Sequence, residues 1–295
     1  MRRNTAVFLA MGAWLAAAGA AWGLPAYQDA VLASSPVGYW RMNEVYPGGS
    51  GQIANLGSAG TAAGDQYSNF GNDPATSMIG VPWDALPGLG ADNKAARLSS
   101  ADPADKIEIP HQDVYNPTTA FSLEAWIRFD SGAANDGIII SKYYATGNQR
   151  GFAFLVDNVT GKLDLMVSRD GTGATTTTYT SQWSVAFEQW THVAAVYQTG
   201  AAPRFYINGQ LDPKTQTSAP LQNVYESTAD LLIGSWVNGN WYNGLLDEVA
   251  FYKTALSEAA IQAHYQAASV PEPPGLALLA CGGIGVLIRR RKRSS

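Results

Sequence analysis

Residues 121–130 (FSLEAWIRFD) alternate between two faces, and this alternation constrains the fold more than any other feature of the chain. Every second residue of the segment is apolar: Phe121, Leu123, Ala125, Ile127 and Phe129. Successive side chains of a β-strand point to opposite sides, so these five share one face. An apolar strand face has to be covered by a second layer. We therefore expect these residues to face a core.

Further short apolar or β-branched segments follow, separated by turn residues. They are residues 107–109, 137–143, 152–157, 163–167, 175–178, 190–197, 204–208, 231–236 and 245–252. Asn208-Gly209 predicts a type I′ hairpin turn, and Ser257 predicts the N-cap of a single helix over 258–267. Aromatic residues make up 11% of the chain and charged residues only 15%, which favours strands. The pattern predicts an all-β, antiparallel two-sheet jelly-roll sandwich and excludes helix bundles and Rossmann folds.

Residues 45–94 are rich in Gly, Ala, Asn, Asp and Pro and show no sustained period. We expect them to form a long loop insert on the surface of the domain. The domain itself is expected to span residues 24–268.

The charge distribution excludes a nucleic-acid partner. Residues 24–270 contain 12 lysines and arginines against 23 acidic residues. Binding to a phosphate backbone needs a basic face, which an acidic body of this kind does not supply.

Residues 1–23 predict a secretory signal peptide, because two arginines precede an apolar run and a stretch of small residues. A retained anchor helix is the alternative, although the apolar run falls short of the roughly 20 residues that a span needs. Export of the body is the expectation.

Residues 269–295 predict a second targeting segment. Pro271, Glu272 and Pro273 precede an uncharged apolar run over 275–288, which is followed by the basic cluster 289–293. By the positive-inside rule the cluster stays in the cytoplasm and the body lies outside. This order resembles the bacterial PEP-CTERM sorting signal. The resemblance implies transient anchoring through transmembrane helix 275–288 and cleavage near the tripeptide by an exosortase-type membrane protease; a permanent anchor is the alternative.

The body as a whole resembles the LamG-like jelly-roll, or concanavalin A-like lectin/glucanase, superfamily. The similar segments occur in the family's order: AVLASSPVGYWRMNE, IANLGSAGTA, DNKAARLSSADPADKIEIP, FSLEAWIRF, QWTHVAAVYQ with RFYINGQ, and LLIGSW with YNGLLDEVAFYKTALSEAAI. The resemblance covers about residues 27–268 and implies that Trp126, Trp190, Val193 and Phe251 pack in the core between the two sheets, where large alternating residues are needed. It also favours a structural role for His192.

Some members of this family bind calcium, and the family packs its first strand beside its last. The resemblance therefore implies a possible Ca²⁺ site at Glu44 and Asp247, since calcium takes six to eight oxygen ligands. The alternative is that the two polar residues hydrogen-bond the ends of the domain. Loop residues Asp136, Asp157 and Asn158 are weaker candidates.

Carbohydrate is the other ligand that the resemblance implies. Residues 236–242 (WVNGNWY) place aromatic side chains around Asn and Gly in a turn. Aromatic faces with fixed polar groups beside them suit a sugar ring. We expect Trp236, Asn238 and Trp241 to contact the ligand and Tyr242 to turn inward.

The sequence contains no E-x-D-x-x-E string of the kind that glucanases of this superfamily carry. Asp247 and Glu248 are adjacent and should point to opposite faces of a strand, and Asp164 and Glu124 are isolated acids. No catalytic residue is therefore assigned, and we do not expect an enzyme.

The favoured function is an exported, non-catalytic recognition or adhesion protein, sorted to the cell surface or the extracellular space, that binds a glycan or matrix polymer. A structural surface or biofilm-matrix protein without a defined small ligand is the main alternative, and a divergent glycan hydrolase is a further one.

Overall fold

The computed structural model describes residues 25–44, 49–62, 66–70, 78–82, 86–99, 105–214, 223–237 and 239–270. The predicted signal peptide, the sorting residues Pro271, Glu272 and Pro273, and the predicted membrane helix 275–288 lie outside these residues. Within the described part of the chain, no helix has both the length and the apolar character needed to cross a membrane.

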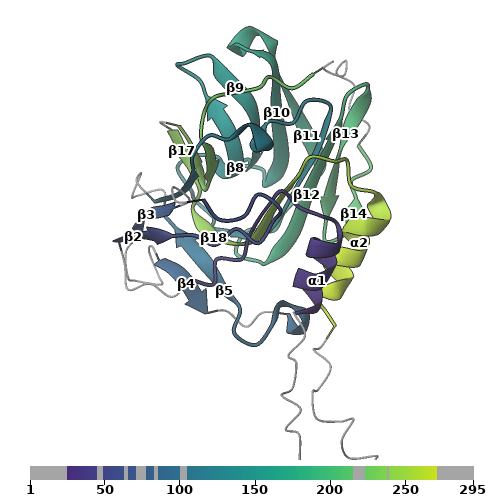
Figure 1. Cartoon of the computed structure of the whole chain (residues 1–295). Coiled ribbons are helices and arrows are strands. Elements are labelled where there is room, and N and C mark those ends of the chain that lie inside the picture. The colour runs from purple at the N-terminus through teal and green to yellow at the C-terminus, as the bar shows by residue number, and fades with distance from the viewer. Residues whose placement is uncertain are drawn as a thin grey trace, which may run out of the picture. The chain divides into compact units, whose positions relative to one another are not determined.

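In the described part of the chain, the first sheet has eight antiparallel strands, and β18 lies at its centre (Figure 1). In spatial order its main path runs through β14 (Gln210–Leu211), β13 (Ala201–Ile207), β12 (Thr191–Gln198), β7 (Ala120–Phe129), β18 (Gly244–Tyr252), β5 (Lys94–Leu98) and β4 (Met78–Pro82). The short strand β1 (Gly38–Trp40) also pairs with β18. The first strand therefore lies beside the last, as the family resemblance implied.

Among the described residues, the second sheet also has eight antiparallel strands. Its order is β11 (Thr176–Ser184), β10 (Lys162–Gly171), β9 (Gln149–Val156), β8 (Gly137–Tyr144), β15 (Leu231–Ile233), β6 (Lys106–Ile109), β3 (Gln66–Phe70) and β2 (Gly49–Gln52). The two sheets confirm the predicted antiparallel sandwich.

The region 45–94 contributes more regular structure than its composition indicated. Its described parts include β2, β3 and β4, which extend the edges of both sheets. Strand pairing depends on backbone groups, so a glycine-rich segment without apolar alternation can still join a sheet. Tyr67 and Ile79 are buried and fasten these edges to the core.

The main core lies between the sheets, and the five alternating residues of β7 all belong to it, as predicted. The rings of Phe121 and Phe152 approach to 5.1 Å, and Phe152 stacks on Phe251 at 5.7 Å. These contacts join β7 and β18 of the first sheet to β9 of the second.

Two helices cover the outer face of the first sheet and lie side by side (Figure 1). They are α1 (Ala26–Ala33) and α2 (Glu258–Ala267). Ser257 caps α2 as predicted, since its hydroxyl accepts from the Ala260 N–H at 3.2 Å. The turn at Asn208-Gly209 is also confirmed, with φ of 50° and 73° between the paired residues Ile207 and Gln210.

The two predicted core tryptophans lie elsewhere than between the sheets. Trp126 is buried under α1 and α2, where its ring packs on Tyr265 at 5.9 Å. It occupies the opposite face of β7 from Phe121 and Ile127, so its burial depends on the helices. Trp190 is only partly buried at the edge of the same cluster. The prediction that both tryptophans lie inside the sandwich is therefore wrong, whereas Val193 and Phe251 do lie there.

We predict that Trp126→Ala lowers the free energy of unfolding by about 3–5 kcal/mol, the range for a large aromatic side chain lost from a packed site. Trp183→Ala is the matched control, because the Trp183 side chain is 38% exposed on β11 and surface changes usually stay within about 0.5 kcal/mol. Urea unfolding of both variants measures the difference. Equal costs would contradict the placement of Trp126 under the helices.

Candidate functional site

The predicted aromatic platform is a short hairpin. β16 (Ser235–Trp236) pairs with β17 (Gly239–Trp241), with Ser235 opposite Trp241. Trp236 and Trp241 are both half-buried, so part of each indole remains accessible. Asn238 lies outside the described residues. The structure therefore brings the two predicted tryptophans together on one hairpin.

Glycine at two positions allows this hairpin to form. A side-chain carbon on Gly239 would lie 2.6 Å from Nε1 of Trp236, so only glycine lets the indole lie against the backbone. Gly234 has φ of +86°, a backbone conformation that is unfavourable for residues with a side chain. Its carbonyl accepts from the Tyr242 N–H at 2.8 Å and closes the base of the hairpin.

Trp236 is held in place by β8. Its ring stacks on Tyr143 with the centroids 5.0 Å apart and the planes at 21°. Ser141 Oγ donates to the Ser235 carbonyl at 2.8 Å, and the Val237 N–H donates to the Tyr143 carbonyl at 3.3 Å. Tyr242 turns inward as predicted and packs on Phe129 at 5.2 Å. The exposed part of Trp236 is thus a fixed surface.

A guanidinium group continues this surface. Arg150 Cζ lies 5.8 Å from the centroid of the Tyr143 ring, a cation–π distance. Arg150 Nη1 donates to Asn148 Oδ1 at 3.0 Å and to the Gly171 carbonyl at 3.2 Å. These bonds fix the guanidinium while Arg150 stays half-exposed.

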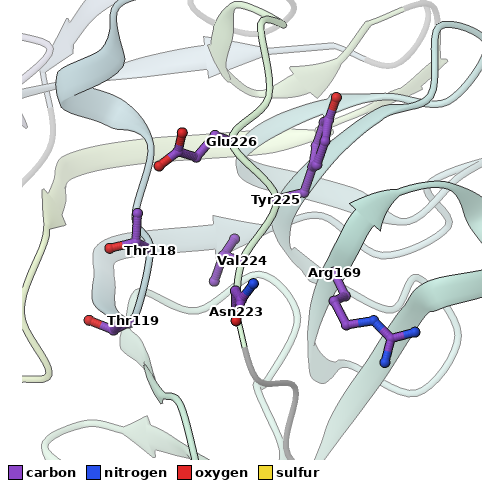
Figure 2. Close-up of a pocket in the computed structure, with 7 residues that line it drawn as sticks. All are labelled: Thr118, Thr119, Arg169, Asn223, Val224, Tyr225 and Glu226. Atoms are coloured by element: carbon purple, nitrogen blue, oxygen red, sulfur yellow. The ribbon is translucent and has the colours of Figure 1, made fainter.

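A hollow of about 490 Å³ lies beside β10, which contributes Arg169 to its lining. It is lined by Thr118, Thr119, Arg169, Asn223, Val224, Tyr225 and Glu226 (Figure 2).

The segment 223–226 bridges the sandwich at this hollow. The Val224 N–H donates to the Thr118 carbonyl at 3.2 Å, and the Tyr225 N–H donates to the Ser168 carbonyl at 2.9 Å. Figure 2 shows the two threonines on one side of this segment and Arg169 on the other. Buried Val224 anchors the segment in the main core. Sequence reasoning missed this hollow because its residues come from three distant segments, none with a motif.

The adjacent acids of β18 enter one buried network. A bulge interrupts the pairing between Asp247 and Ala250, and Glu248 has φ of 52°. Asp247 accepts hydrogen bonds from the backbone N–H of the next residue, Glu248, at 2.7 Å and from the Asn93 side-chain amide. Glu248 accepts from Arg41 Nε at 2.8 Å and from the Tyr39 hydroxyl. The expectation that these acids simply point to opposite faces is corrected, because the bulge breaks the alternation.

Arg41 joins these acids to the rest of the domain. Its guanidinium also donates to Gln28 of α1 at 2.7 Å, to the Leu89 carbonyl at 2.7 Å and to Asn93 at 3.1 Å. Burial raises the pKa of Glu248, and Arg41 and Tyr39 oppose that rise. The network ties the ends of the domain together, which is the role that the alternative to calcium described for this region.

The predicted calcium ligands have separate protein partners. Glu44 Oε1 accepts from the Ala54 N–H at 2.9 Å, and burial raises the pKa of Glu44. Its other oxygen, Oε2, is buried and has no hydrogen-bond partner among the residues that the structure describes. Both oxygens of Asp247 accept hydrogen bonds within the network. Among the described residues, no three acid, histidine or cysteine side chains group as metal ligands. Calcium at Glu44 and Asp247 stays a prediction.

The weaker calcium candidates form a turn. Asp157 accepts from the Val159 and Thr160 N–H groups, and Asp136 accepts from the Asn158 N–H at 3.1 Å. The Thr160 hydroxyl also donates to Asp157 at 2.7 Å and is the largest cause of the lowered pKa of Asp157, to which the two N–H groups add. Hydrogen bonds that Asp136 and Asp157 accept from backbone N–H groups therefore account for the geometry of this turn.

Glu124 is not the isolated acid that the sequence indicated. It is fully buried under the helices and lies 3.0 Å from His264 Nδ1 of α2. The Tyr252 hydroxyl donates to it at 2.6 Å, and His192 Nε2 lies 3.6 Å from it. Burial would raise the pKa of Glu124, but His264 and His192 lower it well below its usual range. His192 is fully buried beside Glu124, as expected of a structural histidine, although among the described residues neither ring nitrogen has a hydrogen-bond partner.

A hydrogen-bonded chain continues from this carboxylate to α1. Ser34 Oγ lies 2.8 Å from His264 Nε2. Burial would lower the pKa of His264, but the charge of Glu124 and its hydrogen bonds raise it. A serine, a histidine and a carboxylate in this order also occur in hydrolases. Here Glu124 and His264 are buried beneath the two helices, so the chain suits the docking of α1 and α2 on the sheet.

The chain belongs to the concanavalin A-like lectin/glucanases superfamily, whose family model matches residues 101–262, more than half of the sequence. A search of curated protein sequences finds no match.

Solved structures share the fold at low sequence identity. The receptor-binding domain of botulinum neurotoxin type G aligns with a TM-score of 0.53 at 15% identity, over 79% of this chain and 51% of that one. The receptor-binding domain of a botulinum neurotoxin C/D mosaic serotype gives 0.54 at 14% identity, over 79% and 51%. The chain thus spans about half the length of these toxin domains.

Domain 4 of AbnA, an extracellular GH43 arabinanase from Geobacillus stearothermophilus solved with arabinotriose, aligns with a TM-score of 0.50 at 15% identity. The alignment covers 79% of this chain and 98% of that domain. At these identities the likeness establishes the sandwich fold.

We predict that His264 makes unfolding pH-dependent. A group whose pKa is raised by folding contributes fully below its unfolded pKa, about 6.5 for histidine, and loses that contribution as the pH rises through the folded value. The free energy of unfolding of the wild type should therefore fall from about pH 6 to pH 9 relative to that of His264→Gln. Urea unfolding across this range measures both. Parallel curves for the two proteins would contradict the proposed pairing with Glu124.

Proposed function

We propose that this protein is an exported, non-catalytic recognition protein that binds a glycan through the platform of Trp236 and Trp241. The stacking of Trp236 on Tyr143 is the observation that carries the proposal. It holds an indole at the surface, where its face can pack against the C–H groups of a sugar ring. Because the indole is already fixed, little side-chain entropy is lost on binding.

Two similar structures support this choice of ligand class. AbnA domain 4 was solved with arabinotriose, and the toxin domains are receptor-binding domains. They share the sandwich, but fold alone does not determine function. The proposal for this chain therefore depends on the platform.

The buried acids support a non-catalytic role. A glycosidase needs two accessible carboxyl groups about 5–5.5 Å or 6.5–9.5 Å apart. Glu124, Asp247 and Glu248 are all buried and engaged in hydrogen bonds that hold the domain together. They are thus committed to structure, which favours binding over hydrolysis.

A glycan array probed with residues 24–270 tests the function. We expect binding to at least one glycan class, and a loss of about tenfold or more in affinity on Trp236→Ala or Trp241→Ala. Trp183→Ala is the control, because it removes an exposed indole from β11.

The same array with calcium or a chelator tests the ion. The metal prediction would be supported if calcium changes glycan binding or the melting temperature of the wild type. The double variant Glu44→Gln, Asp247→Asn should not show this dependence. An intact fold without binding to any glycan would contradict the function and favour a structural matrix protein.

We also propose that the tail directs sorting. Intact mass of the cell-surface or released form should then lack the residues that follow the cleavage point near Pro271, Glu272 and Pro273. A mature protein that retains the basic cluster 289–293 in a host with an exosortase-type protease would contradict the proposal.

A further inference from the structure

The aromatic platform continues into the hollow through paired strand ends. Tyr143 at the end of β8 is the cross-strand partner of Arg150 on β9, and Arg150 is the partner of Gly171 on β10. Trp236 stacks on Tyr143. The three strand ends therefore lie in a row beside the hairpin, in which Arg150 is accessible and Tyr143 and Gly171 are buried beneath it.

The far end of this row meets the hollow. A side-chain carbon on Gly171 would lie 2.7 Å from the Tyr225 ring, so the absence of a side chain leaves room for this ring. The Tyr225 hydroxyl accepts from Gln149 Nε2 of β9 at 3.3 Å. Tyr225 lines the hollow (Figure 2), and its ring also packs over Gly171 at the end of the row.

The hollow holds polar groups that the fold does not use. The side chains of Arg169 and Glu226 are exposed, and neither side chain makes a hydrogen bond or salt bridge within the described part of the chain. The hydroxyl-bearing side chains of Thr118 and Thr119 lie opposite Arg169 across segment 223–226 (Figure 2). These groups remain available to hydrogen-bond hydroxyls of a ligand.

We propose that the platform, the row of strand ends and the hollow form one elongated surface that binds an internal stretch of an uncharged glycan chain. The inference rests on the proposed glycan function and specifies its ligand. Adjacent strands are about 4.8 Å apart, so β8 to β10 spans about 10 Å, and Trp236 and Tyr225 extend the surface at its two ends. A single sugar ring would contact only part of it.

The chemistry along the surface fits a neutral polymer. Indole and phenol faces at Trp236 and Tyr225 can pack on sugar rings, while Arg150 can bond hydroxyls between them and Arg169 and Glu226 can bond hydroxyls in the hollow beyond Tyr225. A polyanionic chain would meet the acidic body, with 12 basic against 23 acidic residues over 24–270. The charge therefore favours an uncharged glycan.

Calorimetry on the purified full-length protein tests the surface. The probes are the disaccharide, tetrasaccharide and hexasaccharide of arabinan, xylan and cellulose, together with the glycans that bind on the array. We expect affinity for the bound polymer to rise by about tenfold or more from the disaccharide to the hexasaccharide. Trp236→Ala should weaken hexasaccharide binding, and so should Tyr225→Ala or Arg169→Ala with Glu226→Gln, at the opposite end.

Two control variants distinguish a loss of binding from a loss of folding. Tyr225→Phe retains the ring and should bind almost as the wild type does. Trp183→Ala removes an indole at the end of β11 that lies away from the hollow. Melting temperatures show whether each variant is folded. Arg169 and Glu226 are exposed, so their substitution leaves the core intact.

The outcomes separate the two proposals. Equal affinity for all lengths, or hexasaccharide binding that needs Trp236 and is unaffected at Tyr225, Arg169 and Glu226, would leave the glycan function standing and overturn the elongated surface. Binding restricted to polyanionic glycans would also overturn it. The absence of any glycan binding by a folded protein would overturn the function itself.

Discussion

The domain depends on a seam along β18. On one side this strand pairs with β7 through most of its length, but on the other it has two partial neighbours. β5 pairs with residues 244–246, and β1 pairs with residues 249–251. Asp247 and Glu248 lie where one neighbour gives way to the other. Arg41 follows β1 and Asn93 precedes β5, so the seam brings their side chains to the two acids. Removing one partner of such a buried pair typically costs about 3–5 kcal/mol.

On the outer face of the first sheet, as at the seam, a buried carboxylate needs hydrogen-bond partners. β7 is buried on both faces, because the second sheet covers one and α1 and α2 cover the other. A carboxylate on the helix-covered face is costly to bury without partners. Glu124 therefore meets His264 from α2 and Tyr252 from β18. The helices that enclose the charge also supply its partners, so their docking is specific as well as apolar.

The strands and the interior core were predictable from the sequence, whereas the partners of the polar residues were not. Alternation on β7 correctly placed Phe121 and Ile127, and Ser257 and Asn208-Gly209 were recognised from their turn chemistry. Local pattern did not show that Trp126 and Glu124 share a face closed by helices, because those helices lie about 100 and 140 residues away in sequence. It also did not reveal the bulge at Asp247. The platform could be found because Trp236 and Trp241 are five residues apart, but the hollow assembles segments that only the topology brings together.

The separation of stabilising from recognising groups follows from this arrangement. Asp247 and Glu248 at the seam, and Glu124 and His264 under the helices, are buried and hydrogen-bonded within the domain, so they do not face a ligand. The accessible aromatic and charged groups lie instead on a hairpin, at strand ends and on segment 223–226. Each is fastened to a strand by backbone hydrogen bonds or, for Trp236, by stacking. A surface fixed in this way does not have to be ordered when a ligand binds. Its contacts are also spread along a row, so affinity should depend on how much of the row one chain can cover at once.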